Sequence, residues 1–253
     1  MIPQATIEFD LSSKCTRSCS FCAPGIPSGR RESGIVLDVQ HHQDVIDDLS
    51  RHAVPGRWII YCGHGEPLLH PGALDMIEAA TTVAGASVAV YTNGDPLTAT
   101  IVDALSRLGV YIVWDCYEND ETSWKVPRLL ASYDPERALV MDHVCVAQQY
   151  YSRCGAIFKA AMRVGYPCMV PSGKMFLAAE GHWLLCCHDY AHKTAMMPGS
   201  VPSEVNRDPQ FRALVESLSR GCRSETIPCQ NCEHPGGCSV GLSYPRLQSS
   251  RFL

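Results

Sequence analysis

The chain has 253 residues, 46% of them hydrophobic and 19% charged, so it can bury a substantial core and is not an intrinsically disordered chain. Its length suits one large domain, or one domain with an appendage, rather than a fibre or a repeat array. The formal net charge of -5 argues against a general nucleic-acid binder, and no run approaches the roughly 18 apolar residues that cross a bilayer, so we expect neither nucleic acid nor a membrane as a partner.

Short β-rich runs alternate with helical patterns through the first two-thirds of the chain. Strands are predicted at residues 6–11, 57–62, 87–92, 110–115 and 138–143. Helices are predicted at 37–51, 71–83 and 97–108, where apolar residues recur at helical spacing. Strands joined by single helices predict a parallel α/β sheet, built as a barrel, a partial barrel or a doubly wound sheet. In each of these architectures the functional groups lie at the carboxyl ends of the strands.

The alternation ends after about residue 144. The remaining residues include a predicted hairpin, with strands at 175–179 and 183–185 around the turn Glu180-Gly181, and one helix at 209–218. Cysteine, glycine and proline are frequent there, which is typical of a small region held together by metal ligands rather than by a large core. We therefore expect two domains, residues 1–150 and 151–253.

The chain contains 14 cysteines, far more than a core needs. Its first ten residues lack the basic and apolar regions of a signal peptide, so we expect a reducing, cytoplasmic location. Metal ligation or thiol chemistry must then explain most of the cysteines. Cys62, Cys116 and Cys145 fall in or beside predicted strands and are interpreted as small buried hydrophobic residues. The pair His41-His42 lies on a predicted helix and is expected to be solvated.

Three cysteines, Cys15, Cys19 and Cys22, follow the first strand with the spacing C-x3-C-x2-C. Structural zinc requires four ligands, and no fourth cysteine or histidine is close in the sequence. Three thiolates on one loop instead suit a 4Fe-4S cluster that leaves one iron open to a small molecule. This spacing, with Phe21 before the last cysteine, resembles that of the radical S-adenosylmethionine (SAM) superfamily.

Two further segments share this resemblance. The sequence His64-Gly65-Glu66-Pro67 after the second strand is similar to the Gly-Gly-Glu-Pro motif of the superfamily, with histidine in place of the first glycine. Tyr91-Thr92-Asn93-Gly94 ends the third strand. The resemblance implies a partial (β/α) barrel of about five to six units, with Glu66 binding the methionine ammonium and Thr92 and Asn93 near the ribose or carboxylate. It implies that SAM is bound by Phe21, His64, Gly65, Glu66, Pro67, Thr92 and Asn93.

A second group of cysteines comprises Cys168, Cys186, Cys229 and Cys232. In an isolated domain these four would favour zinc. Beside a radical SAM core their pattern resembles the SPASM/Twitch extension, and it lacks the later cysteines of the full SPASM form. The resemblance implies one auxiliary 4Fe-4S cluster, hence two clusters in total, with Cys222 and Cys238 as reserve ligands.

Four segments, at residues 65–69, 91–95, 142–143 and 168–172, also resemble segments of the Twitch dehydrogenases of aminoglycoside biosynthesis. This resemblance implies a carbohydrate-like substrate whose alcohol is oxidised to a ketone, with Arg153 facing the alcohol and an electron donor such as flavodoxin or ferredoxin. Cys154 and His188 depart from that pattern, and Cys187 and His188, which adjoin a predicted ligand, can each line the cavity or merely pack. Cys154 as a hydrogen-atom donor would make the protein an epimerase, and sacrifice of the auxiliary cluster would allow sulfur insertion. The residues are also compatible with a zinc-binding or redox-sensing protein without radical chemistry, with a peptide-modifying enzyme, and with an Arg153 that only pairs with a surface acid.

Overall fold

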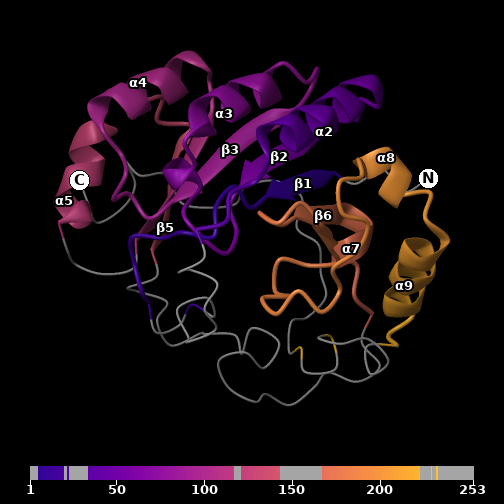
Figure 1. The fold of residues 1–253 in the computed structure, drawn as a ribbon. Helices are drawn as coiled ribbons and strands as arrows, with labels where there is room; N and C mark the ends of the chain where they lie inside the picture. Colours follow the sequence, from indigo (N-terminus) through magenta and orange to yellow (C-terminus); the bar gives the residue numbers. More distant parts are fainter. Residues whose placement is uncertain are drawn as a thin grey trace.

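A computed structural model describes residues 5–19, 22, 34–116, 121–142, 167–222, 229 and 232. Figure 1 shows the arrangement of these elements. Their order along the chain is β1 (Thr6–Phe9), α2 (Val39–Arg51), β2 (Trp58–Tyr61), η2 (Pro67–Leu69), α3 (Ala73–Thr81), β3 (Ser87–Thr92), α4 (Ala99–Arg107), β4 (Tyr111–Cys116), α5 (Thr122–Leu129), β5 (Ala138–Asp142), α7 (Val170–Gly173), β6 (Lys174–Leu177), β7 (Trp183–Leu184), α8 (Pro202–Val205) and α9 (Pro209–Ser219).

One sheet of seven strands runs in the order β5-β4-β3-β2-β1-β6-β7. All neighbouring pairs are parallel except β6 and β7, which form an antiparallel hairpin. The fold class predicted from the sequence is confirmed, because six parallel strands with helical connections make a partial barrel of that size. The predicted hairpin is also present, and its first strand pairs with β1 from Thr6↔Lys174 to Phe9↔Leu177.

The two faces of the sheet have different compositions. The face toward α2, α3 and α4, which lie in a row in Figure 1, is apolar and forms the main core. Strand residues in this core include Ile7, Phe9, Ile59, Tyr61, Val88, Val90, Ile112, Trp114 and Val140. Because successive side chains of a strand point to opposite faces, the residues between them line the inside of the barrel, where Glu8 lies.

The predicted helices are present, with ends set by capping side chains. Asp38 accepts a hydrogen bond from the His41 N–H at the start of α2, and Thr98 accepts one from the Ile101 N–H at the start of α4. Asp208 caps α9 in the same way, through the Phe211 N–H. Such caps satisfy backbone donors that the first helical turn leaves without partners.

The sequence-based expectation that His41 and His42 are solvated is wrong. Both side chains are buried, and His42 is only 1% exposed. The His42 ring packs against Phe9 and Tyr61, and its Nε2 lies 2.9 Å from the Tyr61 hydroxyl. Burial lowers the pKa of His42 to about 4, with a smaller effect from neighbouring histidines, so the ring is neutral at pH 7.

The carboxyl-terminal elements are packed onto the barrel helices. The buried Asp48 carboxylate of α2 accepts hydrogen bonds from both the backbone N–H (2.9 Å) and the hydroxyl (2.7 Å) of Ser203 in α8. Cys168 N–H donates to the Leu218 carbonyl at the end of α9. Among the residues that the structure describes, no helix is both long enough and apolar enough to span a membrane.

Candidate active site

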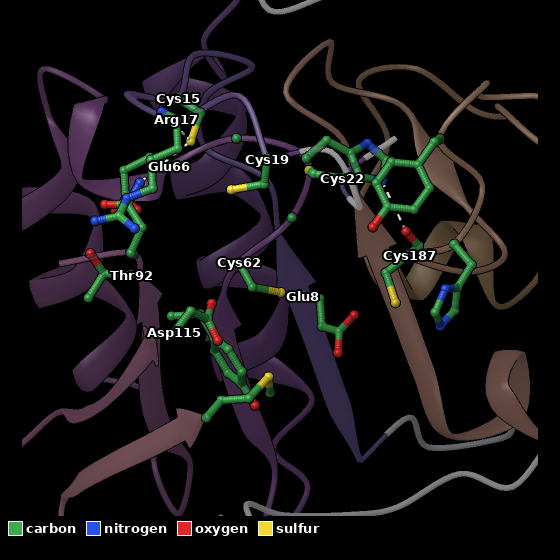
Figure 2. Close-up of a pocket in the computed structure, with 18 of the residues that line it drawn as sticks. Glu8, Cys15, Arg17, Cys19, Cys22, Cys62, Glu66, Thr92, Asp115 and Cys187 are labelled. Atoms are coloured by element: carbon green, nitrogen blue, oxygen red, sulfur yellow. Dashed lines mark hydrogen bonds between the residues drawn. The ribbon is translucent and has the colours of Figure 1, made fainter. Parts of the chain in front are cut away.

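A cavity of about 310 Å³ opens at the carboxyl ends of the parallel strands. Figure 2 shows its labelled side chains, which come from β1, β3 and β4, from the loops that follow β1 and β2 and from the segment after β7. The described residues that line the cavity are Glu8, Cys15, Arg17, Cys19, Cys22, Cys62, Gly63, His64, Gly65, Glu66, Tyr91, Thr92, Asn93, Asp115, Met141, Lys174, Cys187, His188 and Tyr190. The structure therefore brings most of the residues predicted from separate motifs into one place.

The three cysteines of the first motif lie on the loop after β1 and share this cavity (Figure 2). The Cys22 N–H donates to the Cys19 carbonyl at 3.1 Å. The Asn93 side-chain amide lies 3.5 Å from the Cys15 sulfur, and the Arg17 N–H lies 3.4 Å from it. None of the three forms a disulfide with another described cysteine. A cluster bound by three thiolates would leave one iron facing a cavity, so this donor set fits the group that the spacing predicts.

An ion pair connects the cysteine loop to the end of β3. Arg17 binds Asp95 through two hydrogen bonds, of 2.7 Å from Nη2 and 3.0 Å from Nε. The Thr16 hydroxyl adds a third, of 2.6 Å. Burial opposes ionisation of Asp95, but these hydrogen bonds and the charge of Arg17 outweigh it and lower the pKa of the carboxyl. These three hydrogen bonds hold the loop that carries the three cysteines against the end of β3.

Glu66 is buried beside the cavity and is held by backbone donors. The Asn93 N–H donates to one carboxylate oxygen at 2.9 Å, and the Leu68 N–H lies 3.3 Å from the other. Burial raises the pKa of Glu66 to about 7, although hydrogen bonds from Asn93, Thr92 and Leu68 act in the opposite direction. A carboxylate placed in this way can bind an ammonium group strongly, because little water competes for it.

Gly65 permits close approach of the second motif to the cysteine loop. A Cβ atom at this position would lie 1.9 Å from the Ser12 carbonyl oxygen and 2.6 Å from that of Lys14. The Glu66 N–H donates to the same Lys14 carbonyl at 2.7 Å. A side chain at residue 65 would therefore separate Glu66 from the three cysteines. Pro67 begins η2 directly after this contact and is not among the residues that line the cavity.

His64, which replaces the first glycine of the family motif, is buried and lines the cavity. Its Nε2 lies 3.0 Å from the Cys187 carbonyl oxygen. Its ring packs against the Tyr190 ring in a tilted arrangement, with centroids 4.3 Å apart. The histidine at this position of the motif thus connects the loop after β2 to the segment after β7.

Sequence reasoning missed an ion pair inside the barrel. The Lys174 ammonium lies 2.8 Å from the Glu8 carboxylate, and both side chains line the cavity. Burial alone would lower the pKa of Lys174, but the charge of Glu8 keeps it raised. A glutamate between the apolar residues Ile7 and Phe9 of β1 was the available signal. Its partner could not be identified, because 166 residues separate the two.

Two other thiols also face the cavity. Cys62 lies there rather than in the core, so its interpretation as a small core residue is wrong, whereas Cys116 is fully buried as expected. Burial raises the pKa of Cys62 well above its usual value, and the Glu8 charge adds to this shift. Cys187 is the second of these thiols. Cys145 lies outside the described residues.

The four cysteines of the second motif line another, smaller cavity. Cys168, Cys186, Cys229 and Cys232 surround it together with apolar side chains such as Leu185 and Leu218, and with Asp189 and Thr194. None of the four forms a disulfide with another described cysteine. Four thiols around one largely apolar cavity suit an iron-sulfur cluster. Cys222 does not contribute to the described lining, and Cys238 lies outside the part of the chain that the structure describes.

The remaining predicted site residues divide into two groups. His188 lines the first cavity, and its backbone N–H lies 3.3 Å from the Cys186 sulfur. Phe21, Arg153 and Cys154 lie outside the described residues, so their positions stay predictions.

A family model described as the radical SAM superfamily matches residues 10–122. The S-adenosyl-L-methionine-dependent 2-deoxy-scyllo-inosamine dehydrogenase of Niallia circulans is 30% identical over 239 residues, covering 90% of this chain and 92% of that protein.

Solved structures show the same fold. BtrN in complex with AdoMet and 2-DOIA superposes with a TM-score of 0.81 at 22% identity, covering 94% of this chain and 96% of that one. BtrN in an open conformation superposes with a TM-score of 0.70 at 23% identity, covering 92% of this chain and 93% of that one. The protein anSMEcpe with bound AdoMet superposes with a TM-score of 0.61 at 9% identity, covering 93% of this chain and 86% of that one. The relative that matches along nearly the whole length, together with the three-cysteine loop at the strand ends, establishes that the chain belongs to the radical SAM superfamily.

Proposed function

We propose that this protein is a radical SAM dehydrogenase that oxidises a secondary alcohol of an aminocyclitol, or of a related sugar or nucleoside, to a ketone. One observation carries the proposal: the two cysteine-lined cavities are joined by adjacent residues, since Cys186 lines one and Cys187 the other. A dehydrogenase needs both an initiating site and a nearby electron acceptor. The 30% identical relative is named as a dehydrogenase of 2-deoxy-scyllo-inosamine, which supports the same reaction class.

In this proposal, Cys15, Cys19 and Cys22 bind the first 4Fe-4S cluster, and the cavity beside them binds SAM. Glu66 binds the methionine ammonium, with its carboxylate oriented by the Asn93 N–H. Phe21, His64, Gly65, Pro67, Thr92 and Asn93 complete the SAM site. When bound, these groups supply the radical chemistry that removes a hydrogen atom from an unactivated carbon.

Cys168, Cys186, Cys229 and Cys232 are proposed to bind one auxiliary 4Fe-4S cluster. The apolar lining around them supports this role, because limited solvent access tunes the potential of such a cluster. We further propose that residues 151–253 form the auxiliary-cluster region, with β6 and β7 extending the barrel sheet. We also propose a cytoplasmic location, which the lack of disulfides among the described cysteines supports, and an electron donor such as flavodoxin or ferredoxin.

Oxidation of the alcohol removes a hydrogen atom from carbon, a proton from oxygen and one further electron. The chain must orient the substrate and accept the proton. Glu8, Lys174 and His188 line the cavity and can bind hydroxyl and amino groups of a polar substrate. Arg153 remains the predicted partner of the reacting hydroxyl. Met141 lines the same cavity as an apolar side chain and can pack against the carbon skeleton of the substrate.

The test uses the anaerobically reconstituted protein with 2-deoxy-scyllo-inosamine and related aminocyclitols in deuterium oxide. A dehydrogenase forms one ketone for each 5'-deoxyadenosine, and the product contains no deuterium newly bound to the reacting carbon. An alcohol that carries solvent deuterium on that carbon would instead establish an epimerase. Cys154→Ala, Cys62→Ala and Cys187→Ala then separate the possible thiol donors, since only loss of the donor stops epimer release. A product that contains new sulfur would assign sulfur insertion.

A further inference from the structure

Two histidines and a glutamate meet at the tip of the β6–β7 hairpin, apart from both groups of cysteines. The His182 Nε2 and the His192 Nδ1 are 2.6 Å apart, and one carboxylate oxygen of Glu180 lies 3.6 Å from the same His192 nitrogen. All three ligand atoms lie within 4.8 Å of one another. From this geometry we propose that Glu180, His182 and His192 bind a divalent transition-metal ion, with zinc as the preferred occupant. The inference is independent of the proposed function.

Backbone structure holds both parts of the site in place. Glu180 and His182 flank Gly181, whose positive φ of 78° forms the hairpin turn. The Gly181 N–H donates to the Ala178 carbonyl at 2.8 Å, and the Ala178 N–H donates to the His182 carbonyl at 3.0 Å. The two side chains therefore project from a tight hydrogen-bonded turn rather than from a long loop.

His192 comes from a second turn, which the buried Asp189 carboxylate organises. That carboxylate accepts hydrogen bonds from the backbone N–H groups of Lys193 and Thr194 and from the Thr194 hydroxyl. The His192 N–H donates to the Asp189 carbonyl at 3.0 Å. His192 itself has a φ of 53°, in the left-handed region that non-glycine residues rarely adopt. The fold thus holds this imidazole opposite the hairpin tip.

Hydrogen bonds set the protonation of the rings in a way that suits a metal ion. The Cys187 carbonyl can only accept, so the neutral His64 ring carries its proton on Nε2 and leaves Nδ1 as an acceptor. The His192 Nε2, 3.3 Å from that Nδ1, is then the donor. In this neutral tautomer the Nδ1 of His192 carries no proton and presents its lone pair to His182 and Glu180. A hydrogen-bond acceptor at the opposite ring nitrogen commonly fixes the tautomer of metal-binding histidines in this way.

The distances indicate what metal binding would change. Tetrahedral coordination at bond lengths of about 2.0 to 2.2 Å separates ligand atoms by about 3.4 Å. The contact between Glu180 and His192 is already close to this value. The two histidine nitrogens must move apart by about 0.8 Å, as the proton between them is replaced by the ion. Two imidazoles and a carboxylate favour zinc over ferrous iron, because nitrogen and oxygen sites generally bind zinc more tightly than ferrous iron, although copper binds tighter still.

The proposed ion would stabilise one wall of the active site. Cys187, His188 and Tyr190 line the cavity and lie in the segment between β7 and His192. His64, which also lines the cavity, contacts both His192 and the Cys187 carbonyl. Metal binding at the hairpin tip would therefore restrict this segment without supplying an atom to the reaction.

The test measures zinc on the cluster-reconstituted protein. The wild-type protein is equilibrated anaerobically with micromolar zinc, and bound zinc and iron are measured by mass spectrometry. We expect about one zinc for each chain, and zinc X-ray absorption that shows only nitrogen and oxygen ligands. His182→Ala and His192→Ala should each weaken zinc binding at least tenfold, while iron content is unchanged. His52→Ala, which removes an exposed histidine at the end of α2, should leave zinc binding intact.

Three outcomes would overturn the proposal. These are failure of the wild-type protein to bind zinc, sulfur ligands in the absorption spectrum, and zinc binding that survives both histidine substitutions. If either histidine variant loses iron and misfolds, Glu180→Gln provides the second test, because it removes a charged ligand from a partly exposed position. It should weaken zinc binding, and unchanged affinity would also contradict the assignment. None of these measurements requires turnover, so they remain informative even if the dehydrogenase proposal fails.

Discussion

The carboxyl group of Glu66 must lose its proton before it can bind an ammonium group. Its pKa of about 7, raised by burial, lies within the range in which an enzyme is assayed. SAM keeps its ammonium proton below pH 7, because an ordinary α-amino group has a pKa of about 7.7 to 8.0. Acidification therefore changes the charge of Glu66 first.

We predict that SAM affinity falls about tenfold between pH 7.0 and pH 5.5, because a growing fraction of Glu66 is protonated and must ionise to bind. Isothermal titration of SAM into the anaerobic protein measures this dependence. Glu66→Gln should bind SAM weakly at both pH values, with most of the dependence lost and iron content intact. An equally steep pH dependence in the glutamine variant would show that another group titrates.

The site residues that the sequence predicted are those within short motifs. The spacing of Cys15, Cys19 and Cys22 indicated a shared loop, and the structure places all three at one cavity. Contacts between distant segments could not be predicted in this way. The Glu8–Lys174 ion pair depends on sheet order, and the pairing of Arg17 with Asp95 depends on how one loop packs on another strand end.

At the scale of the elements, apolar periodicity predicted the strands β1 to β5 and the helices α2, α3, α4 and α9. The short helix α5 (Thr122–Leu129) was missed, because it contains Pro127 and has no apolar stripe of useful length. Helices of four residues, such as α7 and α8, are too short for a periodic signal. The pairing of β6 with β1 could not be predicted either, because the residue pattern of a strand does not specify which strand lies beside it.

The contact between α2 and α8 provides a stability prediction. Asp48→Ala should lower the free energy of unfolding by about 3 kcal/mol, because it leaves the buried Ser203 N–H and hydroxyl without their acceptor. Asp47→Ala is the matched control on the same helix, since that side chain is exposed and should change stability by less than about 0.5 kcal/mol. Anaerobic urea unfolding of both variants measures the difference. Equal effects would indicate that helix propensity, not the buried contact, determines the result.

At the scale of the whole molecule, the fold places two groups of cysteines around two cavities that share the segment after β7. The sequence predicted both groups from their spacing. It did not predict that Cys186 and Cys187 would face different cavities, because the direction of each side chain depends on the turn that follows the hairpin.

The separation of the cysteines into two cavities predicts the iron content of cysteine variants. The reconstituted protein should contain about eight irons, from two 4Fe-4S clusters. Replacing Cys15, Cys19 and Cys22 together with alanine should leave about four irons and abolish SAM cleavage, whereas Cys168→Ala with Cys186→Ala should leave about four with cleavage retained. Cys222→Ala is the control and should keep the full content. Elemental analysis and 5'-deoxyadenosine measurement test each result, and loss of all iron in the second variant would contradict two separate sites.

The position of β1 between β2 and β6 has a consequence for how the chain is made. After 142 residues have been synthesised, β1 to β5 can pair, but one edge of β1 has no neighbour until Lys174–Leu177 emerges. An open strand edge invites pairing with another chain, and an inward-pointing charge is one of the devices that prevent it. Glu8 supplies such a charge on the nascent barrel. Once Lys174 has been synthesised and β6 pairs with β1, the Glu8 carboxylate gains its counter-ion. The residue that protects the open edge of β1 from other chains therefore also stabilises the pairing of the last parallel strand.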